Sequence, residues 1–554
     1  MWTTTISALL LPLGIWLILS SATPKADENR VAVSGILTAL VASLAFAASG
    51  FALMSPGGLT LAISGQAWAV LGNTGFLMGG ATASLVHFVP QLALALACAL
   101  LVSSVIARRA NYLVQAAVSA VVGGVLFPIA GKWVLGRGWL ATLGQHLNFG
   151  HGAVDFGGLA TAALVAGIAG LALVSVLPRR QAAPNAGLPI AQFPFRAISG
   201  AACVLMGSVT VFGSNPMLGK LADKATLSYF ITLSLACAVA ALCGLLYSRV
   251  TSPQTDSLCA TRAMLAAVIM VSSGAGALPV WVAAALGIVA GLLATVGLYI
   301  VHEKLHLDDD GALITSALLP GAIGFLVTGL FANGSVGAGW NGVGDTSYLA
   351  VSQLGVVGLL PMAATVGDPG QLTAQLIAIG SIGAVSLLGV GVMAYALRPA
   401  LQTPLVIPVV QAPVQMPMPE PTLTMSIASI AAATPQWSEP IAPARIIEIQ
   451  PIQAAPALMI EPEPVSITIE KARDVERVAP PPAQPQPDSQ HAFAATTMAS
   501  EKKKAEDGLL DRLRRLRRAN LPEQPARARK VAYPIRVNGK RLIRPLVDES
   551  STKS

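Results

Sequence analysis

Long apolar stretches separated by short polar connections fill the first 400 residues of the chain. A bilayer core requires about 20 consecutive apolar residues for each helix that crosses it. Stretches that approach or meet this length lie near residues 4–21, 31–53, 89–107, 111–131, 155–177, 194–214, 226–247, 260–276, 278–300, 311–332 and 372–397, and the short eighth one merges with the ninth around Pro279. The pattern predicts an all-α polytopic membrane protein with eleven transmembrane helices.

The first stretch could also be taken for a secretory signal. A signal peptide begins with a positively charged segment, whereas no Lys or Arg precedes the apolar residues that start near Thr4. We therefore expect this segment to be the first transmembrane helix.

The basic residues of the connections are unequally divided between the two sides of the membrane. An odd number of spans places the termini on opposite sides, and Lys and Arg concentrate in cytoplasmic loops. With the N-terminus outside, the outside loops carry Lys132, Arg137, Lys220 and Lys224, and the inside loops carry Lys25, Arg30, Arg108, Arg109, Arg179, Arg180, Arg196, Arg249, Arg262, Lys304 and Arg398. The sequence predicts a multi-pass protein of the inner (plasma) membrane with its N-terminus outside and its C-terminus in the cytoplasm.

Composition divides the chain into two parts. The chain is 54% hydrophobic and only 11% charged, whereas a soluble protein carries about 25% charged residues. Residues 1–400 hold 15 Lys and Arg and 11 Asp and Glu, but the much shorter segment 401–554 holds 20 and 16. We therefore predict a membrane domain over 1–400 and a polar cytoplasmic tail after it.

The tail itself has two predicted parts. Residues 401–500 are rich in proline and lack sustained periodicity, which is typical of a disordered linker. The basic segment 501–554 begins with a predicted amphipathic helix over 501–519, in which Leu509, Leu510, Leu513 and Leu516 form one stripe flanked by Arg512, Arg514, Arg515, Arg517 and Arg518. Such a helix binds anionic lipid headgroups, although nucleic acid, a protein partner or simple solvation of the helix stays open as well.

Two connections on the predicted outside are long, about 54–88 and 333–371, and both are rich in glycine and poor in charge. Irregular backbone at membrane depth has to be buried in protein or line a cavity. These loops either dip into the protein or lie on its surface, and the sequence leaves both possibilities open.

Ionisable side chains are nearly absent from the predicted spans, where such groups commonly mark a transport path. Asp155, which opens the fifth span, is the one acidic residue at membrane depth. Its carboxylate would either attract a cation or accept hydrogen bonds at a helix start. None of the six histidines falls in the middle of a span, so the sequence supplies no proton relay through the bilayer.

Neither metal nor cofactor chemistry is indicated. His302 and His306 have the i, i+4 spacing of a zinc-binding helix, but the carboxylate arrangement of a zinc protease does not accompany them. The five cysteines form no Cys-x-x-Cys motif, and four lie inside apolar runs, as small packing residues do. We expect no metal, no cofactor and no enzymatic activity in the membrane domain.

Two neighbouring motifs carry a family resemblance. The run Trp-Val-Leu-Gly-Arg-Gly-Trp-Leu over 133–140 is followed by Asp-Phe-Gly-Gly over 155–158. They resemble the signature of the ammonium transporter (Amt/Rh) family, in which a Trp-Gly-Gly-Gly-Trp-Leu run precedes a fifth helix that opens Asp-Phe-Ala-Gly-Gly. Residues 107–109 are similar to the end of the family's third helix, and 307–309 with 321–332 are similar to its tenth. The resemblance covers about residues 1–400.

The resemblance implies a fold, an assembly and a substrate. It implies two five-helix halves of inverted topology, an eleventh helix that leans across them, and a homotrimer with one pore for ammonium or ammonia in each subunit. In such inverted repeats the path lies between the halves. The short tail of the family contacts a PII-type signalling protein, but the tail of this chain does not match it, so a PII-type regulator is left open.

The residues that correspond to the family's pore depart from its pattern. Eight residues after Asp155, Ala163 stands where the family has its first pore histidine, and Ala317 stands at the second. The gating phenylalanine and glutamine correspond to Pro90 and Gln91.

The outer part of the implied pathway departs as well. The vestibule tryptophan falls at Leu135, two residues after Trp133, and the sixth helix offers Phe212 and Ser214 in a looser match. We place all nine of these positions, Asp155 included, along the implied substrate pathway.

The two alanines bear directly on mechanism. A bare charge in the hydrocarbon core costs several kcal/mol or more, and paired imidazoles pass a proton near neutral pH, whereas Ala163 and Ala317 do not. Three hypotheses follow: an ammonium/ammonia transporter with an altered pore, a non-transporting sensor or scaffold, and a channel for another small neutral solute.

Overall fold

The computed structural model describes two units of the chain separately, Met1–Glu420 and Pro421–Ser554. Its described residues are 6–79, 85–177, 189–215, 218, 222–307, 309, 311–343, 355–361, 366–398, 535–537 and 540–542. In the second unit, strands β3 (Ile535–Val537) and β4 (Lys540–Leu542) pair antiparallel. The predicted linker over 401–500 and the predicted amphipathic helix over 501–519 lie outside the described residues.

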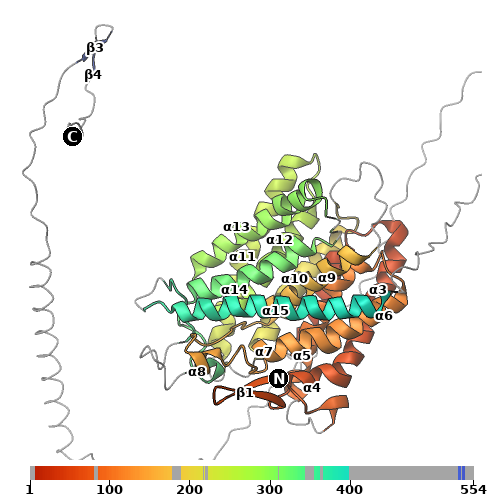
Figure 1. The fold of residues 1–554 in the computed structure, drawn as a ribbon. Helices are drawn as coiled ribbons and strands as arrows, with labels where there is room; N and C mark the ends of the chain where they lie inside the picture. The colour runs from red at the N-terminus through yellow and green to blue at the C-terminus, as the bar shows by residue number, and fades with distance from the viewer. Residues whose placement is uncertain are drawn as a thin grey trace, which may run out of the picture. The chain divides into compact units, whose positions relative to one another are not determined.

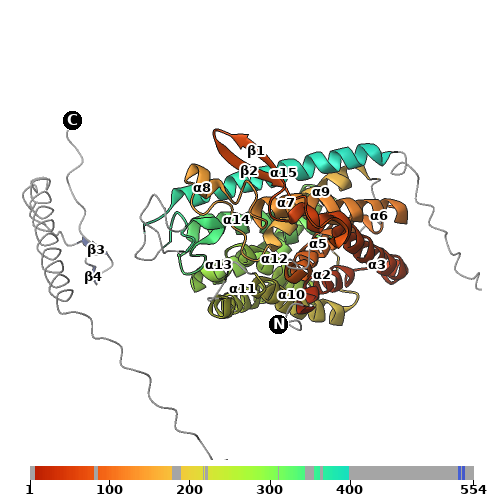
Figure 2. The same cartoon turned by 90° about the horizontal axis from the view of Figure 1, so that it is seen from below.

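The first unit is a bundle of apolar helices (Figures 1 and 2). Its first half contains α2 (Leu10–Ser20), α3 (Glu28–Ala45), α4 (Phe51–Met54), α5 (Leu85–Ile106), α6 (Tyr112–Val121), α7 (Phe127–Val134), α8 (Leu143–Leu147) and α9 (Leu159–Val176). Its second half contains α10 (Pro194–Gly213), α11 (Ala222–Thr251), α12 (Ser257–Gly274), α13 (Val280–Leu292) and α14 (Leu319–Phe331), and α15 (Pro369–Ala396) follows.

The predicted spans are confirmed as helices. Within the described part of the chain, 10 helices are long and apolar enough to cross a membrane, and a shorter apolar helix, Ser7–Ser20, occupies the position of the first predicted span. The eighth and ninth spans are separate, because a 3-10 turn over Ala275–Ala277 and the extended Pro279 interrupt the helix between them. The chain is therefore a multi-pass helical membrane protein.

The two halves repeat one packing scheme. In the first half, α3 packs on α5 and α6, and α5 packs on α9; in the second half, α11 packs on α12 and α13, and α12 packs on α14. The leading helices α2 and α10 pack on each other, as do α9 and α14. Five crossings are an odd number, so the second half starts from the opposite side of the membrane, as expected of inverted repeats.

The last helix joins the two halves. Figure 1 shows α15 running along the other helices, and it packs on α9 and α7 of the first half and on α14 of the second. This is the position predicted for the eleventh helix.

The two long connections take different forms. Strands β1 (Leu59–Ile63) and β2 (Gln66–Leu71) form an antiparallel hairpin with an exposed first strand, so this part of 54–88 lies on the surface. In the connection 333–371, by contrast, the Trp340 side chain is buried and packs edge-on against Phe156 at 4.6 Å between ring centroids. The described part of that connection is thus folded into the protein.

Small residues bring the central helices into close contact. A Cβ added to Gly167 of α9 would lie 2.5 Å from Cβ of Leu318, and one added to Gly321 of α14 would lie 2.9 Å from the carbonyl oxygen of Ala160. Helices in lipid associate through close packing of this kind, because lipid tails are as apolar as the helix surfaces and no hydrophobic effect drives the helices together.

We expect Gly167→Val to destabilise the folded protein by about 1–3 kcal/mol, because the added side chain overpacks the contact with Leu318. The loss of monodisperse protein on heating in detergent measures this effect. Gly380→Ala is the matched control, since an added Cβ there meets nothing within 4 Å. Equal thermal stability of the two variants would show that the contact between Gly167 and Leu318 is loosely packed.

Candidate functional site

A cavity of about 390 Å³ lies among α5, the turn after α7, the loop before α9 and the end of α10. Four of the predicted pathway residues line this cavity, namely Pro90, Gln91, Leu135 and Ser214. Its other lining residues are Met54, Pro56, His87, Leu94, Gly136, Arg137, Phe156, Gly157, Gly158, Val211 and Asn215. We refer to it below as the α5–α10 cavity.

Among the described residues, five polar side chains line the α5–α10 cavity, namely His87, Gln91, Arg137, Ser214 and Asn215. The Gln91 carbonyl oxygen, Oε1, is buried and has no hydrogen-bond partner within the described structure. Ser214 donates its hydroxyl proton to the carbonyl oxygen of Thr210 at 2.7 Å, so its oxygen retains lone pairs toward the cavity. The site therefore offers hydrogen-bond acceptors to a small donor.

Two other predicted residues lie beside the cavity rather than in its wall. Trp133 donates its indole N–H to the carbonyl oxygen of Val70 in β2 at 3.0 Å and packs edge-on against Trp139. Phe212 is fully buried and packs against the Tyr229 ring at 4.8 Å between centroids. Both aromatic side chains support the wall instead of facing the cavity.

Asp155 organises the start of α9. Its Oδ1 accepts a hydrogen bond from the Gly158 backbone N–H at 2.9 Å, and its Oδ2 accepts from the backbone N–H and the hydroxyl of Thr161, each at 2.7 Å. The residue is only 1% exposed. This geometry matches the helix-start alternative, because the carboxylate satisfies donors that the first turn of a helix leaves free.

A second buried aspartate plays the equivalent part in the other half. Asp309 accepts hydrogen bonds from the backbone N–H groups of Leu313 and Ile314, both at 2.8 Å. Burial raises the pKa of Asp309, and these hydrogen bonds act in the opposite direction. The pair Asp155 and Asp309 thus starts the two central helices from opposite ends of the bundle.

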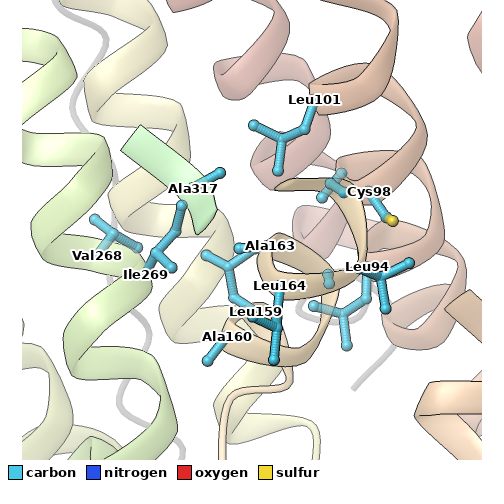
Figure 3. Packing of buried hydrophobic residues seen from close by; sticks show 14 of the residues in the cluster. Leu94, Cys98, Leu101, Leu159, Ala160, Ala163, Leu164, Val268, Ile269 and Ala317 are labelled. Carbon is cyan, nitrogen blue, oxygen red and sulfur yellow. The ribbon is translucent and has the colours of Figure 1, made fainter. Parts of the chain in front are cut away.

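Ala163 and Ala317 each lie eight residues after one of these aspartates. Ala317 belongs to the π-helical turn Ile314–Leu318, which precedes α14 and packs on α9. Both alanine side chains are 0% exposed, so a water-sized sphere does not touch them. Figure 3 shows both among apolar side chains of the core, with the thiol of Cys98 nearby.

Three amide side chains fix the loop before α9, a role that the sequence did not reveal. Gln371 of α15 accepts from the His151 N–H and donates to the Gly152 carbonyl, both at 2.9 Å. Gln375 pairs in the same way with the N–H and carbonyl of Val154, and Asn341 donates to the His151 carbonyl at 2.8 Å. Burial lowers the pKa of His151 to about 4, so this loop carries a neutral imidazole.

Sequence reasoning also missed two residues of the cavity wall, His87 and Arg137. It predicted Arg137 only as a charge of an outside loop, and it assigned Lys132 to the same kind of loop. The structure puts Lys132 in the last turn of α7, 1% exposed, with its ammonium donating to the carbonyl oxygens of Ser55 at 2.6 Å and Gly136 at 3.0 Å. A usable signal was the position of Arg137 inside the motif over 133–140.

The fold and the α5–α10 cavity define a class of protein: a polytopic membrane protein of inverted repeats with a cavity at one end of the central helices. The family model of the ammonium transporter family matches residues 1–411. The chain belongs to the ammonium transporter family.

Individual relatives agree with this assignment. The ammonium transporter Amt2 of Archaeoglobus fulgidus is 30% identical over 324 residues, which span 56% of this chain and 65% of that protein, less than two thirds of its length. An ammonium transporter of Bacillus subtilis is 24% identical over 342 residues, 61% of this chain and 81% of that protein. The crystal structure of Candida albicans Mep2 superposes with a TM-score of 0.58 at 19% identity, covers 72% of this chain and 84% of that one, and shares the fold.

We expect Asp155→Ala to lower the free energy of unfolding by about 2–3 kcal/mol, because three buried donors lose their acceptor. Asp155→Asn keeps an acceptor oxygen, so we expect it to lower the free energy of unfolding by less than Asp155→Ala does. The melting temperature of the protein in detergent, followed by intrinsic fluorescence, measures both changes. Ser175→Ala is the control, since this exposed hydroxyl bonds only to the carbonyl of Ala172 in its own helix. If Asp155→Ala melts like the control, the carboxylate does not hold α9.

Proposed function

We propose that this protein carries ammonia across the membrane in its uncharged form, without a proton relay, along the central helices of each subunit. The observation that supports this most directly is the pair Ala163 and Ala317, which stand fully buried among apolar side chains. A charged ammonium ion in such surroundings costs far more than neutral ammonia.

In this mechanism the proton stays in the water. Ammonium and ammonia exchange in solution, and the α5–α10 cavity takes up the neutral molecule. There the molecule donates a hydrogen bond to Oε1 of Gln91, an acceptor without a partner in the described structure. No side chain then receives or returns a proton, so transport produces no net current.

Passage below the cavity requires motion. Because a water-sized sphere does not reach Ala163 or Ala317, the described conformation is closed at that depth. Rotamer changes of neighbouring leucines would open it, since side chains of a packed core still change rotamer. The barrier is therefore apolar and steric rather than electrostatic.

The same closure favours a second candidate, a non-transporting sensor or scaffold that keeps the fold of a transporter. In that case the α5–α10 cavity binds its ligand, and the packed centre around Ala163 and Ala317 never opens. A channel for another small neutral solute is the third hypothesis, and the apolar centre suits it as well.

We further propose a homotrimer in the inner membrane with the N-terminus outside. The excess of basic residues in the predicted inside loops supports this orientation. It places the α5–α10 cavity on the outer side, since that cavity adjoins the loop before α9.

Purified protein in liposomes of low ammonia permeability tests the transport proposal. On addition of ammonium chloride we expect faster internal alkalinisation than in protein-free liposomes, with no transient current in planar membranes. Ala163→His combined with Ala317→His restores a relay, and we expect it to produce current if the scaffold conducts. Ser316→Ala is a control for the alignment with the family's second pore histidine, because a shift of that alignment by one residue would place the buried Ser316 in the pore instead of Ala317.

Each outcome separates the hypotheses. Silence of both wild type and the double variant, in current and in alkalinisation, favours the sensor or scaffold. A robust wild-type current would contradict the proposal, because it requires a charge to cross. Retention of the oligomer on size-exclusion chromatography checks that the added imidazoles, which enter a packed core, do not unfold the variant.

We also propose that the membrane domain is independent of the tail. A chain that ends near Pro404 is expected to insert and to assemble as a trimer, because α15 ends at Ala396 and completes the helical packing. Native mass spectrometry in detergent measures the assembly, with the full chain as control. Failure of the shortened chain to give a stable oligomer would move the domain boundary.

A further inference from the structure

We propose that the α5–α10 cavity discriminates by charge, so that it admits small uncharged amines and excludes cations, with Arg137 as the specificity-determining residue. This deepens the proposed function by naming the form of the substrate that enters. Among the described residues that line the cavity, Arg137 is the one full cation, and none is a carboxylate. It is therefore unlike a site built to attract a positive ion.

The guanidinium of Arg137 keeps its positive charge in this position. The side chain is exposed, and no carboxylate of the described chain forms an ion pair with it. Arginine is protonated at every physiological pH. A small ligand in the α5–α10 cavity therefore meets an uncompensated positive charge in its wall.

The backbone holds Arg137 at the cavity at some cost. Its φ of 53° lies in the left-handed region, which favours glycine. The flanking turn is tightly packed, since a Cβ added to Gly136 would lie 2.8 Å from the Met54 carbonyl oxygen and one added to Gly138 would lie 2.5 Å from that of Lys132. A strained residue in a rigid turn at a cavity is an indication of function.

The buried carboxylate of Asp155 does not offset Arg137. Asp155 lies in the chain next to Phe156 of the cavity wall, but it is 1% exposed and its oxygens accept three internal hydrogen bonds. The buried ammonium of Lys132, which bonds to the Gly136 carbonyl, adds a second positive charge close to the same wall. The two cations outnumber the one carboxylate.

The unpaired acceptor in the cavity wall favours a ligand that donates a hydrogen bond. Oε1 of Gln91 is buried without a partner in the described structure, and pairing it with a donor removes the cost of leaving it unsatisfied. An uncharged amine satisfies both requirements, because it donates to Gln91 and carries no charge past Arg137. The aromatic ring of Phe156 in the wall is already engaged edge-on with Trp340.

Thiol labelling tests the charge of the cavity without any need for transport. Leu135→Cys in the full-length protein places a thiol in the wall, and methanethiosulfonates of similar size carrying a sulfonate or a trimethylammonium group react with it. The measured quantity is the reaction rate with the sulfonate reagent divided by the rate with the trimethylammonium reagent. We expect this ratio to be about three- to tenfold higher for Leu135→Cys than for a free thiol in solution, as one nearby charge predicts. The protein without Leu135→Cys measures the background from its five native cysteines.

Two further variants in the Leu135→Cys background identify the source of the preference. Arg137→Lys keeps the charge and should keep the ratio, whereas Arg137→Glu should invert it. Equal or faster reaction of the trimethylammonium reagent beside Arg137, or a ratio that Arg137→Glu does not change, would overturn the proposal. A protein that shows the expected ratios but no alkalinisation in liposomes would refute transport and leave the charge selection standing.

Discussion

Two buried carboxylates fix the central helices on which the rest of this fold depends. A helix that starts inside a membrane protein has free backbone N–H groups and no water to satisfy them. Asp155 and Asp309 supply the acceptors at the two ends of the bundle. Each starts a helix that carries a buried alanine eight residues later, so the same device sets the depth of Ala163 and of Ala317 in the two inverted halves.

The same constraint explains most of the other buried polar groups. Gln371 and Gln375 reach from α15 to the backbone of the loop before α9, and the Lys132 ammonium bonds to two backbone carbonyls. Ionisable and polar residues at membrane depth are commonly functional. In this protein these three act on the backbone, and they position the wall of the α5–α10 cavity without facing a substrate.

This member of the ammonium transporter family keeps the fold and has alanines at its centre. The inverted halves, the crossing helix and the cavity at one end are present, whereas the centre around Ala163 and Ala317 is apolar and closely packed. A fold hosts a function through its site rather than by itself. With Arg137 in the wall and alanines at the centre, we propose neutral solutes as the species that this site suits.

The sequence by itself determined the spans, because an apolar stretch of membrane length specifies a helix locally. The family motifs were also enough to place Pro90, Gln91 and Leu135 on one implied pathway, and all three line the α5–α10 cavity. The helix-start role of Asp155 is local, since its partners Gly158 and Thr161 follow within six residues, and the sequence already offered it as one of two alternatives. Only the tertiary structure decided that Arg137 lies in the same cavity wall as Gln91 and Ser214. That wall joins segments far apart in the chain, and neither apolar length nor motif spacing encodes the geometry of their meeting.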